Sequence, residues 1–178
     1  MTFKSTVVTI PGLTGSGPNH WQSCWEKRYG FKRISQKNWD TPVCEEWINT
    51  IEKETMHLDL ANTLFVGHSL GCTAIVMWAK KYNKRLKGAM LVAASDNEAA
   101  DFPKTTTGFV PMPLFKLPFP SILVMSSNDD YLSVERAHYF GNNWSSEVID
   151  IGNAGHINTA SGYGEWKEGL VILKKLDN

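Results

Sequence analysis

The stretch LFVGHSLGCTA, residues 64–74, decides the fold of this chain. It places the pattern G-x-S-x-G, centred on Ser69, between an apolar run typical of a strand and a segment typical of a helix. A serine in that position lies on a sharp turn that exposes its hydroxyl, and the flanking glycines let neighbouring backbone approach closely. The alternative is a tight turn with an idle serine. The strand–turn–helix context favours Ser69 as a nucleophile, with the Leu70 amide aimed at a developing oxyanion.

On both sides of this stretch, apolar runs rich in β-branched residues alternate with helix-like segments. The runs are near-continuous in hydrophobicity, which is typical of a parallel sheet covered on both faces. Predicted strands are 6–10, 63–66, 89–92, 122–125 and 148–151, with 31–35 as a weaker sixth; predicted helices are 20–29, 44–57, 70–82, 134–142 and 165–176. Right-handed crossovers then give an α/β fold: a three-layer, doubly wound, mainly parallel sheet of about six strands, with ligands at the carboxyl ends of the strands.

Length, charge and cysteine content limit the possible domain organisation, partners and location of the protein. With 178 residues, 42% of them hydrophobic, we expect a single domain, 1–178. Eighteen basic and 18 acidic residues give zero formal charge, so we expect a small-molecule substrate and neither nucleic acid nor membrane as partner. There is no secretory-type start, and three cysteines without a C-x-x-C pair argue against a disulfide framework or a metal site. These features predict a cytoplasmic protein.

A nucleophilic serine requires a histidine base and an orienting carboxylate, in the chain order serine, acid, histidine for this architecture. The strand 122–125 runs into SSNDDYLS, residues 126–133, and the strand 148–151 is followed by GNAGH, residues 152–156. His156 is therefore the candidate base. Spacing leaves Asp129 and Asp130 nearly even as the acid, with Asp96 and Asp101 as weaker candidates.

The other four histidines fit this role less well. His57 and His138 fall within predicted helices, and His20 precedes the serine in the chain. His68 is adjacent to Ser69, but neighbouring side chains on such a turn diverge. We therefore expect His68 to be a packing residue.

The first predicted strand is followed by the glycine-rich loop PGLTGSGPNHWQ, residues 11–22. Its spacing matches neither G-x-x-x-x-G-K-[ST] nor G-x-G-x-x-G, and no lysine follows to reach a phosphate. We expect it instead to supply the second oxyanion donor, the backbone N–H of Leu13.

Residues 95–120 interrupt the alternation with five prolines and several large apolar residues. Proline fixes φ and removes backbone donors, so we expect an extended, semi-rigid path over the sheet edge and no helical cap domain. Phe109, Met112 and Phe115 are candidates for an acyl pocket. The alternative is that they cover the sheet edge.

Several segments together resemble a known family: 11–22, the turn around Ser69, LPFPS at 117–121, Asn128-Asp129, GHIN at 155–158, and SGYGEW at 161–166. The chain resembles the retinoblastoma-binding-protein-type serine hydrolases, which include bacterial YdeN-like proteins and have a minimal α/β-hydrolase fold. The resemblance implies Ser69 as nucleophile, His156 as base and Asp129 as acid. The family usually shows Asp-Pro-Tyr at this point, so Asp130 stands where proline is common.

The sequence thus predicts a carboxylesterase-like serine hydrolase that cleaves a small ester, or a related amide or thioester, through an acyl-serine intermediate. The predicted site is Ser69, Asp129 and His156, with the Leu13 and Leu70 amides as oxyanion hole and no metal or organic cofactor. Two alternatives remain at this stage: a weakly active or inactive hydrolase-fold protein that binds a protein partner, and a flavodoxin-like nucleotide-binding module.

Overall fold

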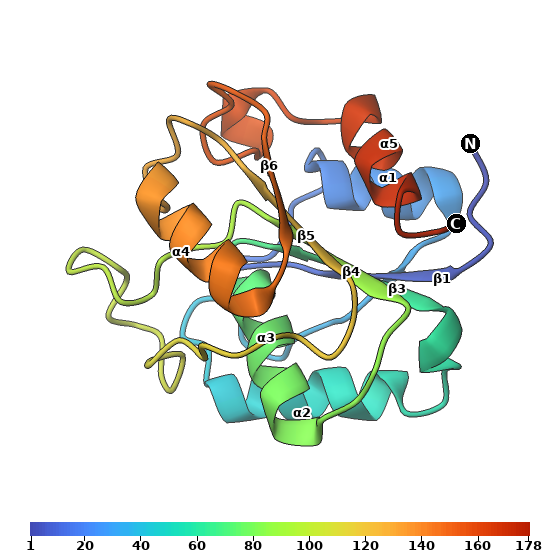
Figure 1. Ribbon diagram of the computed structural model, residues 1–178, viewed down its shortest axis with the longest axis horizontal. Helices are drawn as coiled ribbons and strands as arrows, with labels where there is room; N and C mark the ends of the chain where they lie inside the picture. The colour runs from blue at the N-terminus through green and yellow to red at the C-terminus, as the bar shows by residue number, and fades with distance from the viewer.

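The computed structural model describes residues 1–178 and contains one six-stranded sheet in the order β2-β1-β3-β4-β5-β6 (Figure 1). All neighbouring strands are parallel. The strands are β1 (Thr6–Ile10), β2 (Lys32–Arg33), β3 (Thr63–His68), β4 (Gly88–Val92), β5 (Ser121–Met125) and β6 (Glu147–Asp150). The order reverses between β1 and β3, so the crevice that open α/β sheets use for ligands lies at the carboxyl ends of these two strands.

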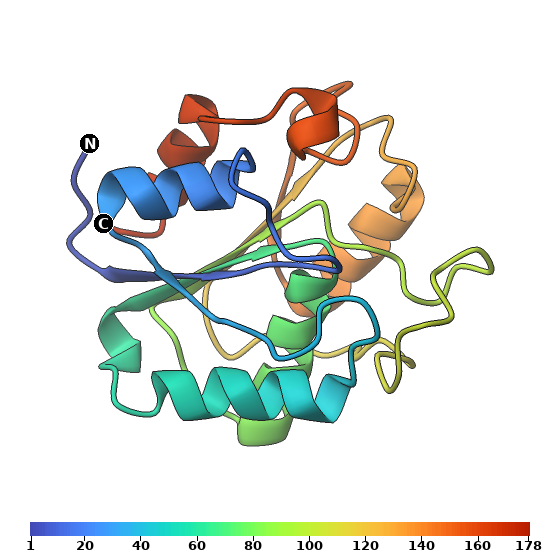
Figure 2. The same cartoon turned by 180° about the vertical axis from the view of Figure 1, so that it is seen from behind.

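Five helices cover the two faces of the sheet. They are α1 (Trp21–Tyr29), α2 (Cys44–Thr55), α3 (Leu70–Tyr82), α4 (Val134–Trp144) and α5 (Lys167–Lys174). Helices α1 and α5 pack on one face and α2, α3 and α4 on the other, as the two opposite views show (Figures 1 and 2). The fold is the three-layer, parallel α/β architecture that the sequence predicts. None of the helices combines the length and apolar character needed to cross a bilayer.

The central strands are buried on both sides, which explains their unbroken apolar sequences. Every residue of β3, β4 and β5 is buried. Side chains alternate between the faces: Phe65 packs with α2 and α3, whereas Leu64 and Val66 pack with α1 and α5. Trp21 and Trp25 share one face of α1, as predicted, and both contact Trp166.

The predicted elements match the observed ones with small shifts at their ends. The last helix starts later than predicted because Trp166, at its N-cap, has a left-handed backbone with φ of 33°. Helix α2 ends at Thr55, so His57 lies just beyond the helix. The expectation that 1–178 is a single domain stays a prediction.

The segment between β4 and β5 contains no helix or strand, as expected, but its path differs from the prediction. The sheet edges are β2 and β6, whereas this segment crosses the helices of the α2–α3–α4 face. The Cys44 N–H at the start of α2 donates to the Thr107 carbonyl (2.8 Å), and the Leu117 N–H donates to the Trp144 carbonyl at the end of α4 (3.1 Å). Phe109 and Met112 are buried in the core of that face. Burial of these apolar side chains holds the segment there.

Candidate active site

Ser69 lies on the turn between β3 and α3 with φ of 52° and ψ of −125°. A non-glycine residue with positive φ is strained and persists only when its surroundings enforce it. The flanking glycines are such a constraint: a Cβ at Gly71 would overlap the Ile10 carbonyl oxygen, and one at Gly67 would lie 2.8 Å from Ile75 Cδ1. The turn therefore needs glycine on both sides of Ser69, as the motif predicts.

Asp129 follows β5 and His156 follows β6, and the two side chains are hydrogen bonded. The His156 Nδ1–H donates to both carboxylate oxygens of Asp129, at 2.9 and 3.0 Å. Because an ionised carboxylate only accepts, this pairing places a proton on Nδ1, and in the neutral ring Nε2 then carries the lone pair. The Tyr131 N–H also donates to Asp129 Oδ1 (2.9 Å). The Asp129 side chain is 1% exposed, whereas Asp130 is exposed and makes no hydrogen bond through its side chain.

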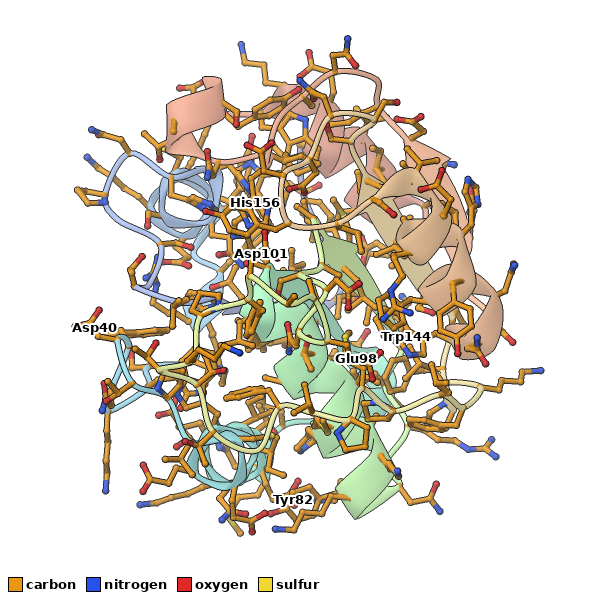
Figure 3. All side chains as sticks on the ribbon, turned by 90° about the vertical axis from the view of Figure 1, so that its left-hand side faces the viewer. Asp40, Tyr82, Glu98, Asp101, Trp144 and His156 are labelled. Atoms are coloured by element: carbon orange, nitrogen blue, oxygen red, sulfur yellow. The ribbon has the colours of Figure 1, made fainter.

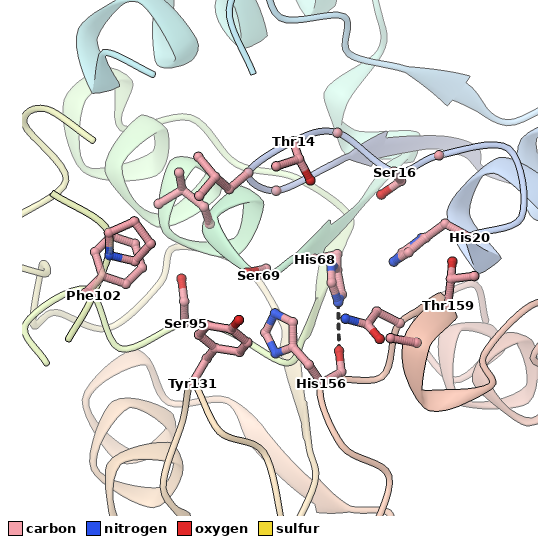
Figure 4. A pocket seen from close by; sticks show the side chains of 18 residues that line it. Thr14, Ser16, His20, His68, Ser69, Ser95, Phe102, Tyr131, His156 and Thr159 are labelled. Carbon is pink, nitrogen blue, oxygen red and sulfur yellow. Dashed lines mark hydrogen bonds between the residues drawn. The ribbon is translucent and has the colours of Figure 1, made fainter. Parts of the chain in front are cut away.

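Ser69 and His156 line the same cavity, of about 330 Å³, with Leu13 and Leu70 (Figure 4). The Ser69 hydroxyl makes no hydrogen bond to another protein group and is left to face the cavity. The structure therefore brings the predicted serine and histidine to one cavity, with the Asp129 carboxylate bonded to the ring.

Two backbone amides in this cavity are also unused. A Cβ at Gly12 would lie 2.8 Å from Ser69 Cβ and 3.1 Å from the Leu70 nitrogen, so the loop after β1 touches the Ser69 turn. The Thr14 N–H, the next amide along this loop, donates to the Trp39 carbonyl (2.9 Å). By contrast, the Leu13 and Leu70 N–H groups donate to no protein acceptor. The protein therefore leaves one donor unused on each of the two loops that meet at Ser69.

Sequence reasoning missed the residue that holds this loop, Gln22 of α1. It is fully buried, and its Nε2 donates to the carbonyls of Val66 (3.0 Å) and Ile10 (3.4 Å), at the ends of β3 and β1. Its Oε1 accepts from the Ser16 hydroxyl (2.6 Å). Gln22 thus joins the loop to the two strands on either side of the crevice. The sequence signal was its place in the 11–22 motif, which carries no information on its partners.

A charged side chain supports the same loop from outside. Arg33 lies on the edge strand β2, and its guanidinium donates to the Ser16 carbonyl (3.0 Å) while pairing with Glu26 of α1 (2.8 Å). The Ser23 hydroxyl donates to the same Ser16 carbonyl (2.9 Å). The loop after β1 therefore rests on hydrogen bonds from α1 and β2.

Two further histidines lie next to the candidate base. His68 Nε2–H donates to the His156 carbonyl (3.0 Å), so His68 is a packing residue, as predicted, that also fixes the His156 backbone. The His20 ring lies 4.7 Å from that of His68, and its Nδ1 accepts from the Gln22 N–H. Burial lowers the pKa of His20 to about 4, with the nearby charges of Arg33 and His156 adding to the effect. Burial also lowers the pKa of His68 well below its usual range.

The weaker acid candidates lie on the segment after β4, apart from the Asp129–His156 pair. Asp96 accepts from the Arg136 guanidinium (2.9 Å), and Arg136 also pairs with Glu98 (2.6 Å). Asp101 is exposed and makes no ion pair. Figure 3 looks onto this side of the molecule, with His156, Asp101 and Glu98 labelled.

The prediction that Phe109, Met112 and Phe115 line an acyl pocket is wrong. Phe109 and Met112 are buried in the core, and Phe115 packs against that core. Phe102 and Pro103, from the same segment, line the cavity instead. The assignment depends on where α2 and α4 lie, which the local sequence does not reveal.

The fold and this arrangement of side chains define the chain as an α/β hydrolase. The family model "Serine hydrolase" matches residues 7–175, so the chain belongs to the serine hydrolase family. A solved YdeN-like hydrolase from Pectobacterium atrosepticum is similar over 97% of this chain and 90% of its own, with 32% identity and a TM-score of 0.85.

Three further similarities are consistent with this placement. The ydeN gene product of Bacillus subtilis has 21% identity and a TM-score of 0.79, covering 97% of this chain and 98% of its own. In sequence alone, the hydrolase YdeN of Bacillus subtilis (strain 168) is 33% identical over 96 residues, which is about half (49%) of each chain. An esterase from Thermogutta terrifontis, 15% identical over 100% of this chain and 92% of its own, has the same fold with a TM-score of 0.71. The chain is thus a YdeN-like member of the serine hydrolase family.

Proposed function

We propose that this protein is a carboxylesterase-like serine hydrolase with Ser69 as nucleophile, His156 as general base and Asp129 as the acid that orients the ring. One observation carries the proposal. The strained Ser69 faces a cavity that also exposes the imidazole whose Nδ1–H is bonded to a buried carboxylate. That tautomer leaves His156 Nε2 able to take the proton of the serine hydroxyl.

The proposed reaction has two halves. As Ser69 Oγ attacks the carbonyl carbon of an ester, His156 Nε2 takes the hydroxyl proton, and Asp129 stabilises the imidazolium. The carbonyl oxygen becomes an oxyanion that accepts from the Leu13 and Leu70 amides, each contributing about 3 kcal/mol. The imidazolium then protonates the departing alcohol oxygen, which leaves an acyl-serine. Water attacks the acyl-serine by the same steps and regenerates Ser69.

The test is a panel of p-nitrophenyl esters from acetate to octanoate, assayed with Ser69→Ala as the blank. We expect the wild-type protein to hydrolyse the short esters and the variant to lose nearly all of that rate, because no other group can form the acyl intermediate. Equal rates for both proteins would refute the proposal and would favour the hypothesis of a binding protein.

A further inference from the structure

The cavity has two chemically different sides. In Figure 4, Phe102, Tyr131 and Ser95 lie on one side of Ser69, and Ser16, His20 and Thr159 lie on the other. The Ser95 hydroxyl proton is donated to Asn97 Oδ1 (2.7 Å), so the aromatic rings are the main contacts offered on that side. Pro103, next to Phe102 in the chain, and Asn158, next to Thr159, also line the cavity. The scissile carbonyl must sit at Ser69, between them. The two halves of a substrate therefore meet different surroundings.

The polar side offers hydrogen-bond donors that the protein does not use. Asn158 Oδ1 accepts from the Ser161 N–H and hydroxyl (3.1 and 3.2 Å), which fixes the orientation of the amide, while its Nδ2 donates to no protein acceptor. The Thr159 hydroxyl makes no hydrogen bond within the protein. By contrast, the hydroxyl proton of Ser16, also on this side, is donated to Gln22. Asn158 and Thr159 can therefore bind a hydroxyl or carbonyl of a ligand.

The cavity wall has no permanently charged side chain. No lysine, arginine, aspartate or glutamate lines it, and the acid behind it, Asp129, is paired with His156. His20 and His68 are both neutral at pH 7 because burial lowers their pKa values. A charged ligand group would lose hydration here without gaining a partner, which is unfavourable. The volume of about 330 Å³ lies near the lower end of the range for small-molecule sites.

The geometry points to a substrate class, an inference that rests on the proposed function. We propose that the substrate is an uncharged ester with a short apolar group on one side of the scissile carbonyl and a hydroxyl- or amide-bearing group on the other. Asn158 and Thr159 recognise the polar group, and Phe102 and Tyr131 contact the apolar one.

The first test compares kcat/KM for esters of matched size. Propyl butyrate is the apolar reference; 1-butyrylglycerol and propyl 3-hydroxybutyrate carry hydroxyls on opposite sides of the carbonyl; butyrylcholine and O-butyrylglycolate carry a charge. We expect one hydroxylated ester to exceed propyl butyrate by about tenfold, as one or two neutral hydrogen bonds would give, and both charged esters to fall below it. The inference is overturned if neither hydroxylated ester is preferred, or if a charged ester matches the preferred one.

The second test uses the near-isosteric change Thr159→Val. It should reduce the ratio of kcat/KM for the preferred hydroxylated ester over propyl butyrate several-fold, because the Thr159 hydroxyl is lost while the Asn158 amide remains. Thr105→Val, at an exposed residue outside the cavity, is the matched control and should keep the wild-type ratio. An unchanged ratio in Thr159→Val would overturn the recognition role.

Hydrolysis of p-nitrophenyl acetate distinguishes failure of the substrate inference from failure of the proposed function. If that ester is cleaved in a Ser69-dependent manner while the hydroxylated esters show no preference, only the substrate inference fails. If wild-type and Ser69→Ala proteins do not differ on that ester, the proposed function itself fails.

Discussion

Two loops form opposite walls of the cavity, and they are held in different ways. The β1 loop (residues 11–20) is fixed from beneath by Gln22, which is fully buried and bonded to the backbone of β1 and β3. The β4 loop (residues 93–120) is fixed away from the cavity, by the pairing of Arg136 with Asp96 and Glu98 and by burial of Phe109. Its cavity-lining residue Phe102 is only partly buried.

The difference matches what each loop contributes. The β1 loop offers a backbone amide, at Leu13, whose position relative to Ser69 must be accurate for it to stabilise an oxyanion. The β4 loop offers side chains, which can change without moving a strand. We therefore expect changes beneath the β1 loop to affect stability and rate, and changes at the tip of the β4 loop to affect substrate preference.

The largest effect is expected at Asp129, which lies outside both loops and is hydrogen bonded to the candidate base His156. Asp129→Asn should lower kcat by about 10⁴-fold, because an amide stabilises the wrong imidazole tautomer. Asp130→Asn, one residue away, should stay within about twofold of wild type, since that carboxylate is exposed and makes no hydrogen bond. Steady-state kinetics on one short ester compares them. The reverse order of effects would show that the wrong aspartate has been assigned.

The next largest effect tests the support of the β1 loop. Gln22→Leu removes the donor of two buried carbonyls and should lower the free energy of unfolding by roughly 3 kcal/mol. Glu98→Gln in the β4 loop is the matched change, because Glu98 is partly exposed (35%) and its pairing contributes less than about 1 kcal/mol. Urea unfolding measures both. Equal losses would remove the distinction between the two loops.

Acidification should destabilise the folded protein through His20, at the end of the β1 loop. The pKa of His20 is lowered to about 4 in the folded protein, so the unfolded chain binds more protons between about pH 6.5 and pH 4. Stability therefore falls as the pH drops through this window, by up to about 3 kcal/mol from His20. His68, Arg33 and His156 face this ring, and buried His68 changes stability in the same direction.

The control for this pH effect is His20→Asn, which keeps a residue favoured at a helix N-cap. Urea unfolding at pH 7.0, 5.5 and 4.5 should give a smaller loss for the variant than for the wild-type protein. Identical slopes would mean that His20 is not responsible.

The smallest effect is expected at the tip of the β4 loop. Phe102→Ala should raise KM for short apolar esters by about fivefold through lost apolar contact, and should change Tm by no more than about 2 °C. Phe115→Ala is the matched variant, because Phe115 packs against the core outside the cavity. It should lower Tm and leave the chain-length preference unchanged. If Phe115→Ala alters that preference, the assignment of the two phenylalanines is wrong.

The sequence predicts best the features that short sequence patterns indicate. Unbroken apolar runs mark the buried parallel strands, and the pattern around Ser69 marks the turn, because its glycines are required by contacts within adjacent elements. The order of Asp129 and His156 follows from the connectivity of the fold. The apolar runs and the pattern around Ser69 are short patterns that can be recognised without knowing their distant contacts.

The features that it predicts poorly depend on distant contacts. Spacing alone leaves Asp129 and Asp130 equal, whereas the turn closed by the Tyr131 N–H buries the first and exposes the second. Gln22 gains its role from strands 12 and 44 residues away. Phe102, and not Phe109, lines the cavity because contacts with α2 and α4 fix the path of the β4 loop.

The central claim is that Ser69 is an activated nucleophile, and covalent labelling tests it most directly. The protein would be treated with a fluorophosphonate probe, digested, and the modified peptide mapped by mass spectrometry, with Ser69→Ala in parallel. We expect one adduct, on the peptide that contains Ser69, and none on the variant. Failure of the wild-type protein to react, or an adduct at another residue that persists in Ser69→Ala, would contradict it.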